Sequence, residues 1–257
     1  MGTVPIENRK VLVHELASPT TPGPVPTQRP NRREVMRART SDEIKEAARG
    51  LLRLGPATQL SMRAVARQVG MTPSGLYRYF DGHQHLVSAL VGDAYADAGD
   101  AIAAAAPPED VAAQAHAMAH AYREWGGNHR EEFALMFSTD PQITGDLAVL
   151  LDPGQINRFF AAPIANYAAG LACGDVVLDA PPDAAPQLAP MVDDLRLRSD
   201  SPLRSHQLGA LLSGWACLHG FISLELFGPL GWFYADPDEA WAHHVRGVLR
   251  TLGYQGV

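Results

Sequence analysis

From Thr40 onward, apolar residues recur at helical spacing almost without interruption. No stretch of four to eight β-branched residues alternates with polar ones, as a half-buried strand would require. The pattern therefore predicts an all-α fold. Beyond the first eighty residues, helices are expected at residues 82–105, 109–126, 129–138, 154–173, 203–227 and 237–252, with at most a short helix at 188–197 in a proline-rich, acidic segment.

The first helix is predicted to begin near Thr40. Thr40 and Glu43 stand at the spacing of a capping box, in which a hydroxyl and a carboxylate satisfy the first free backbone N–H groups. Gly55 and Pro56 then end the helix. Its apolar face is expected to carry Ile44, Ala47, Ala48, Leu51 and Leu52.

Residues 61–80 predict two short helices joined by a tight turn at Gly70. Ser61 can cap the first and Thr72 the second, and Pro73 occupies the first helical position, where its missing N–H costs nothing. The side chains expected inside are Met62, Val65, Ala66, Val69, Leu76 and Phe80. Such a pair is the helix-turn-helix shape that sets its second helix into the major groove of DNA.

The outward positions of the second helix are the candidate DNA readers: Ser74, Gly75, Tyr77, Arg78 and Tyr79. Arg78 is the expected base reader, because arginine bonds guanine bidentately with roughly 1–3 kcal/mol of discrimination. Serine and tyrosine hydroxyls suit phosphate oxygens, and Gly75 would let the backbone approach the duplex closely. The alternative is a surface helix with incidental tyrosines.

Charge is distributed unevenly along the chain. Residues 29–80 carry 11 Lys and Arg against 4 Asp and Glu, whereas residues 81–257 carry 8 against 22, and the whole chain has a net charge of −7. A protein that neutralises phosphates with one face and stays soluble with the rest has this distribution. A solvated basic helix would produce it too.

The first 35 residues are rich in proline and read as a flexible tail. The run of arginines in which the tail ends could follow a DNA backbone or enter a minor groove, and a solvated extension is the alternative. The arginines concerned are Arg29, Arg32, Arg33, Arg37 and Arg39.

Composition points to a soluble globular protein, with 46% hydrophobic and 19% charged residues among 257. No apolar run approaches the roughly 18 to 20 residues of a membrane helix, and the N-terminus lacks the layout of a signal peptide, so we expect no membrane partner and a cytoplasmic location. The two cysteines, Cys173 and Cys217, are expected to be small buried thiols.

The helix-turn-helix residues carry a family resemblance. Ser61-Met-Arg-Ala-Val-Ala-Arg-Gln-Val-Gly70-Met-Thr-Pro-Ser-Gly-Leu-Tyr77-Arg-Tyr-Phe80 closely resembles the DNA-binding region of the tetracycline-repressor (TetR) family, and the resemblance is specific from about Thr40 to Leu90. It implies that Arg63 reaches a base or a phosphate. It also implies that the operator is lined by Thr72, Ser74, Gly75, Tyr77, Arg78 and Tyr79.

Two further residues complete the expected DNA-binding set, Ser61 and His83. His83 departs from the family pattern, because the family usually has a lysine at this helix start that contacts a DNA phosphate. The phosphate contact is therefore expected to be weak or pH-dependent, although backbone N–H groups at the helix start could hold a phosphate.

In the C-terminal half, Trp215-Ala-Cys-Leu-His219-Gly220 looks like the Trp-His-Gly pattern of one C-terminal class within the same family, and Phe133 to Phe137 fits that class. The resemblance implies that the last two helices pair with their copies in a homodimer. The chain is thus divided into a tail at 1–35, a DNA-binding domain at 36–82, and a larger helical ligand-binding and dimerisation domain at 83–257.

A ligand-responsive repressor needs a pocket for a small-molecule effector that releases it from a palindromic operator. The candidate lining residues are Tyr95, His116, His120, Phe159, Trp215 and His219, with Met118, Tyr122 and Phe160 beside them. Aromatic residues at helical spacing are, however, more often core than pocket. His116, His120 and Glu124 share one helical face, but no fourth ligand supports a metal site, so neither metal nor cofactor is expected.

Two other classes of protein are alternatives to a transcription regulator. An enzyme would need a nucleophile elbow, a dinucleotide fingerprint or a phosphate loop, and none is present in the sequence. A helical interaction module would keep the dimer but lack salt-dependent DNA affinity.

Overall fold

A computed structural model describes residues 31–55, 60–105, 110–138, 153–178 and 203–257. All regular elements in these ranges are helices, and only an isolated bridge between Val176 and Tyr254 has β geometry. The all-α prediction is confirmed, and the expected bounds of the later helices agree within two residues. The elements are α1 Arg32–Leu54, α2 Met62–Gln68, α3 Pro73–Leu76, α4 His83–Ala104, α5 Val111–Asn128, α6 Arg130–Met136, α9 Pro153–Cys173, α11 Ser205–Phe227, the 3-10 helix η3 Leu230–Trp232 and α12 Pro237–Thr251.

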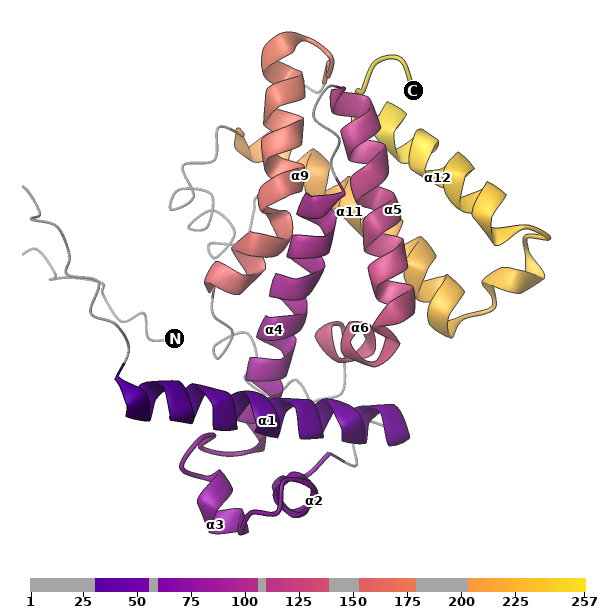
Figure 1. The fold of residues 1–257 in the computed structure, drawn as a ribbon. Coiled ribbons are helices and arrows are strands. Elements are labelled where there is room, and N and C mark those ends of the chain that lie inside the picture. The colour runs from indigo at the N-terminus through magenta and orange to yellow at the C-terminus, as the bar shows by residue number, and fades with distance from the viewer. Residues whose placement is uncertain (1–30, 56–59, 106–109, 139–152, 179–202) are drawn as a thin grey trace, which may run out of the picture.

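The helices form two layers of very different size (Figure 1). α1 lies across one end of the molecule with α2 and α3 beneath it, and α4 rises from this small head into a bundle with α5, α9, α11 and α12. α6 lies between the bundle and α1, and packs on both α1 and α4. α4 and α6 are therefore the elements through which the two layers touch most directly.

The start of α1 differs from the prediction. The cap is Asn31, whose Oδ1 accepts from Arg33 N at 2.9 Å and Glu34 N at 3.0 Å, while Glu34 Oε2 accepts from Asn31 N. Thr40 lies inside the helix, where its hydroxyl donates to the Met36 carbonyl. The apolar pattern in the sequence begins only at the first core residue of α1. It therefore predicted the buried part of the helix but not the two exposed turns that precede it.

The predicted apolar face of α1 is confirmed, with Ile44, Ala48 and Leu52 buried. The exposed first turns of this helix contain Arg32, Arg33, Arg37 and Arg39, which were expected at the end of a flexible tail. Arg29 and the possible helix at 188–197 lie outside the described residues.

The bundle core depends on a close crossing of α4 and α9. A Cβ on Gly99 would stand 2.6 Å from the Arg158 carbonyl oxygen, so only glycine permits this approach. Four large aromatic side chains, distributed over α6, α9 and α12, are at most 1% exposed: Phe133, Phe159, Tyr167 and Trp241. Their burial supplies much of the hydrophobic stabilisation of the bundle.

α11 is the most apolar long helix. By length and composition alone it is the one helix among the described residues that could cross a membrane, and 22% of its most apolar window is buried. The two cysteines follow the same trend: Cys217 on α11 and Cys173 at the end of α9 are both exposed, so the prediction of buried thiols is wrong. Helical apolar surroundings in the sequence did not reveal that one face of α11 is left exposed by the described residues.

Candidate DNA-binding surface and ligand cavity

The first helix of the pair, α2, is built as its sequence dictates. Ser61 is the N-cap and its hydroxyl accepts from Ala64 N at 3.2 Å, while Met62, Val65 and Ala66 are buried. Gly70 ends the turn with φ of 70°, a left-handed conformation that glycine adopts without strain. The predicted caps, core and turn of α2 are confirmed.

The second helix, α3, is short. Thr72 caps it, with its hydroxyl accepting from Gly75 N at 3.2 Å, and Pro73 stands at the first helical position. A Cβ on Gly75 would lie 3.3 Å from this hydroxyl, so the small residue also keeps the cap intact. Leu76 and Phe80 are buried, as predicted.

After Leu76 the chain continues in tight turns rather than α-helix. Arg78 N donates to the Gly75 carbonyl and Tyr79 N to the Leu76 carbonyl, both i to i+3 bonds. Such bonds place Tyr79 on the same side as Leu76, and its ring is half-buried against the core. The expectation that Tyr79 points outward is therefore wrong, whereas Ser74, Tyr77 and Arg78 are exposed and Gly75 is partly so.

Arg37 on α1 holds the end of this turn in place. Its Nη2 donates to the Arg78 carbonyl at 2.8 Å, and its guanidinium lies 5.7 Å from the centre of the Tyr79 ring. The sequence marked Arg37 as part of a basic arm and missed this contact, which joins residues 41 positions apart. Arg37 thereby fixes the backbone that presents the Arg78 side chain.

The remaining DNA-binding candidates fall into two groups. Ser61, Arg63 and Thr72 are exposed on the same small head. His83, at the start of α4, has its Nε2 buried with no hydrogen-bond partner among the described residues. In this conformation that nitrogen is not accessible to a phosphate, whereas the flexible side chain of a lysine at this position could extend its ammonium group into solvent.

Ion pairs join the head to the bundle. Asp93 on α4 accepts from both Lys45 and Arg49 of α1, each at 2.8 Å. Burial alone would lower the pKa of Lys45, but hydrogen bonds to Asp93 and Asp42 outweigh it and raise that pKa. Beside these pairs is a polar cleft of about 480 Å³, where Asp97 accepts from the Trp125 indole.

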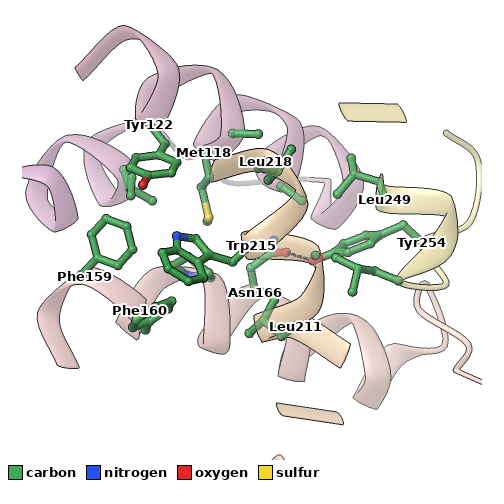
Figure 2. A pocket seen from close by; sticks show the side chains of 16 residues that line it. Met118, Tyr122, Phe159, Phe160, Asn166, Leu211, Trp215, Leu218, Leu249 and Tyr254 are labelled. Atoms are coloured by element: carbon green, nitrogen blue, oxygen red, sulfur yellow. Dashed lines mark hydrogen bonds between the residues drawn. The ribbon is translucent and has the colours of Figure 1, made fainter. Parts of the chain in front are cut away.

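The bundle contains an apolar cavity of about 80 Å³ between α5, α9, α11 and α12 (Figure 2). Figure 2 shows Trp215 in the middle of the lining side chains, with Met118 and Tyr122 on one side and Phe159 and Phe160 on the other. The sequence missed Asn166 and Tyr254 at the opposite end, because Tyr254 reaches the cavity only through the return of the chain after α12. Their hydrogen bond, 2.7 Å from Tyr254 Oη to Asn166 Oδ1, closes that end.

Of the other pocket candidates, Tyr95 and His219 lie behind the lining. Tyr95 packs edge-on against Phe159. His219 stacks on Trp215, and its Nδ1 shares a 2.9 Å hydrogen bond with the Tyr122 hydroxyl while its Nε2 faces Ser223. Burial lowers the pKa of His219 and raises that of Tyr122, so both are uncharged at neutral pH.

His116 and His120 stack on each other away from the cavity, where His120 meets Trp241 of α12. Burial, followed by repulsion from Arg246 for His116 and from His116 for His120, lowers both pKa values. Among the described residues, no group of three His, Cys, Asp or Glu side chains is arranged to hold a metal ion.

Comparisons with known proteins cover both layers. Residues 44–90 match the family model of bacterial regulatory proteins of the tetR family, and residues 115–248 match that of the tetracyclin repressor-like C-terminal domain. The HTH-type transcriptional regulator Rv1816 of Mycobacterium tuberculosis is 32% identical over 242 residues, which are 88% of this chain and 97% of the relative.

Solved structures resemble the whole arrangement. The crystal structure of regulatory protein SCO4313 aligns with a TM-score of 0.62 and 28% identity, covering 86% of this chain and all of that one. A protein from Rhodococcus sp. RHA1 aligns with a TM-score of 0.59 over 83% of this chain and 95% of its own, and at 21% identity it supports the fold alone.

Proposed function

Because the chain belongs to the TetR family of DNA-binding transcription regulators, which is not an enzyme family, we propose that it is a ligand-responsive repressor that binds a palindromic operator as a homodimer. A small-molecule effector would release it from DNA. The observation that carries the proposal is the exposed edge of α3, with Arg78 free to reach a base and its backbone held by Arg37.

The proposed DNA contacts divide by chemistry. Arg78 reads a base edge, and Arg63, Tyr77 and the hydroxyls of Ser61, Thr72 and Ser74 contact phosphates or neighbouring bases. Gly75 lets the helix approach closely. Tyr79 acts from beneath by supporting the turn. The Nε2 of His83 is buried, so that nitrogen contacts a phosphate only if the ring rotates, whereas the backbone N–H groups at the start of α4 remain candidates for a phosphate contact.

The proposed dimer uses α11 and α12. One face of these helices is not covered by any other described part of the chain. A groove of about 420 Å³ between them is lined by several small residues together with His243 and His244, and it exposes Cys217 and Gly247. Leu224 and Phe227 on α11 are each 49% exposed. Large uncovered apolar faces on soluble proteins are usually interfaces, and small residues let helices pack closely. A four-helix contact with a second copy would cover this face.

A dimer also satisfies the requirement of DNA recognition. One helix-turn-helix reads too few bases to find a site in a genome, whereas a twofold dimer presents two recognition helices roughly 34 to 36 Å apart, about one turn of DNA. The head at 36–82 would then be the reading domain and residues 83–257 the sensing and dimerisation domain. We expect the protein in the cytoplasm, where its operator lies.

DNA selection with the full chain tests this proposal. We expect a palindromic site, with affinity that falls steeply as salt rises because phosphate contacts release counterions. Arg78→Ala should weaken operator binding about tenfold or more, from roughly 1–3 kcal/mol of lost readout, and relax preference at one position in each half-site. Arg158→Ala, which removes the same charge from a surface ion pair with Asp100 on the bundle, is the matched control and should change neither. Selection of no sequence, or equal effects of the two variants, would overturn the proposal.

A further inference from the structure

The apolar cavity in the bundle has walls without charge. The sixteen described residues that line it include no Asp, Glu, Lys, Arg or His side chain, and burial raises the pKa values of the lining phenols Tyr122 and Tyr254. A charged ligand would lose its hydration there and gain no counter-ion. The cavity therefore selects for an uncharged molecule.

Aromatic rings dominate one end of the cavity. Phe159 meets Phe160 at 4.9 Å and Tyr122 at 5.3 Å between ring centres, and Phe160 meets Trp215 at 5.6 Å, all three pairs being edge to face. The Met118 side chain completes this end (Figure 2). Rings in this arrangement leave edges and faces that a further ring can contact, and thioethers contact aromatic rings favourably.

Most polar groups of the cavity are already partnered. Asn166 Nδ2 donates to the Val111 carbonyl and to Gln114 Oε1, and its Oδ1 accepts from Tyr254. The Tyr122 hydroxyl is bonded to His219. The exception is Trp215 Nε1, a buried donor that completes no hydrogen bond of normal geometry among the described residues. It lies close enough to the Tyr122 hydroxyl to oppose the effect of burial on that pKa, but the hydroxyl makes its hydrogen bond with His219. An indole N–H can only donate, and buried donors are rarely left unpaired in native structures.

We propose that the effector is an uncharged aromatic molecule with one hydrogen-bond acceptor, held between Phe159, Phe160 and Met118 with its acceptor on Trp215 Nε1. This assignment rests on the proposed function, which requires an effector site in this domain. Trp241 also has an unpartnered buried Nε1, but it does not line the cavity. Trp215 is thus the place where a buried donor without a well-aligned partner borders the cavity.

The cavity is small, so binding of an aromatic ligand would require its wall to move. At about 80 Å³ it has roughly half the volume of a 150 Å³ cavity known to admit benzene, so a ligand must displace part of the wall. Trp215 and Phe160 are only partly buried and are the walls able to move. Trp215 contacts Phe137 at the end of α6, and α6 packs on α1, so displacement of Trp215 would be felt at the DNA-binding head.

Three small probes test the assignment by titration calorimetry on the full chain: acetophenone, which carries a carbonyl acceptor, ethylbenzene, which has none, and benzoate, which is charged. Acetophenone should bind the wild-type protein most tightly and benzoate most weakly. Trp215→Phe keeps the ring and removes the donor, and it should weaken acetophenone roughly five- to tenfold while changing ethylbenzene less than twofold.

Trp241→Phe is the matched control, because it removes an equivalent unpartnered indole N–H outside the cavity and should leave the probe ratios unchanged. As a measurement that needs no variant, the indole N–H resonance of Trp215 should shift with acetophenone and not with ethylbenzene. Equal affinity of the wild-type protein for acetophenone and ethylbenzene, a preference for benzoate, no binding of any probe, or equal losses in Trp215→Phe would each overturn the assignment.

Operator binding measured on the same preparation separates this assignment from the proposed function. Intact operator binding with no discrimination among the probes rejects the ligand class and leaves the regulator. Absence of operator binding rejects the regulator, however the probes behave.

Discussion

The DNA-binding head and the helical bundle differ in how far apart along the chain the residues lie that stabilise each of them. In the head, Ser61 caps the N–H of Ala64 and Thr72 that of Gly75, each three residues away. In the bundle, the Tyr122–His219 hydrogen bond joins residues 97 positions apart, and the Tyr167 hydroxyl donates to the Leu252 carbonyl 85 positions away. Short-range capping chemistry shapes the head, and long-range aromatic packing shapes the sensor.

This difference suits the two tasks. Because local caps fix its two short helices, we expect the head to keep its shape when the bundle shifts and to present the same residues to DNA. A bundle built on aromatic side chains around a small cavity can shift when a ring moves, and such a shift changes operator affinity only if the ligand favours one arrangement.

Of the substitutions that would test this contrast, Phe133→Ala on α6 is expected to have the largest effect on stability. Phe133 is 1% exposed and its ring contacts Tyr122, Phe137 and His219. Its truncation should lower the free energy of unfolding by about 3–5 kcal/mol, because it removes a large apolar side chain and leaves a cavity. Urea denaturation measures this loss, and a loss below about 1 kcal/mol would show that the aromatic cluster does not hold the bundle.

A smaller effect is expected at the junction between the two regions. Asp93→Asn removes the carboxylate that pairs with Lys45 and Arg49, and it should lower stability by about 2 kcal/mol, the contribution of hydrogen bonds to charged groups. It should also reduce the change in operator affinity that ligand binding causes, because the ion pairs between α4 and α1 are lost. Asp100→Asn, on the same helix but paired with Arg158 of the bundle, is the control for charge. An unchanged ligand response would place the coupling elsewhere, with α6 the next candidate.

Within the head, Thr72→Ala should cost about 1 kcal/mol, because the N–H of Gly75 loses its capping hydroxyl. Thr72→Ser keeps the hydroxyl and should retain most of the stability. Thermal unfolding followed by circular dichroism separates the two variants. Equal losses in both would show that the threonine methyl group, rather than the cap, stabilises α3.

The smallest effect concerns pH. Burial lowers the pKa of His219 below its ordinary 6.5, so the unfolded chain takes up a proton near pH 6.5 that the folded chain does not. Stability is therefore expected to fall as pH drops below about 6.5, until the folded pKa is reached. His219→Asn should flatten the difference between pH 7 and pH 5.5 in denaturant titrations. An identical pH dependence in both proteins would contradict a buried, neutral His219.

Local chemistry explains how far the sequence could be read. Ser61, Gly70, Thr72 and Pro73 each act on the backbone within a few residues, so the helix-turn-helix was predicted from single positions. The start of α1 was missed because Asn31 and Glu34 precede any apolar pattern, and Tyr79 was misplaced because the i to i+3 turns after Leu76 have no distinct signal.

The cavity could be predicted only in part. Phe159 and Trp215 were recognisable as aromatic residues on predicted helices, but nothing in their spacing separates a lining residue from a core one. Asn166 and Tyr254 meet across 88 positions, and the exposure of Cys217 depends on what a single chain leaves uncovered. Such facts belong to the packing of whole helices and are not encoded by neighbouring residues.

The central claim is that two copies of this chain present two heads to one stretch of DNA. Sedimentation of the full chain with its selected operator measures this directly, as the mass of the complex at increasing protein concentration. We predict two chains on each palindromic site, with the half-site centres about one helical turn, roughly 34 to 36 Å, apart. A complex with one chain per site, or a half-site that binds as tightly as the full palindrome, would contradict the claim.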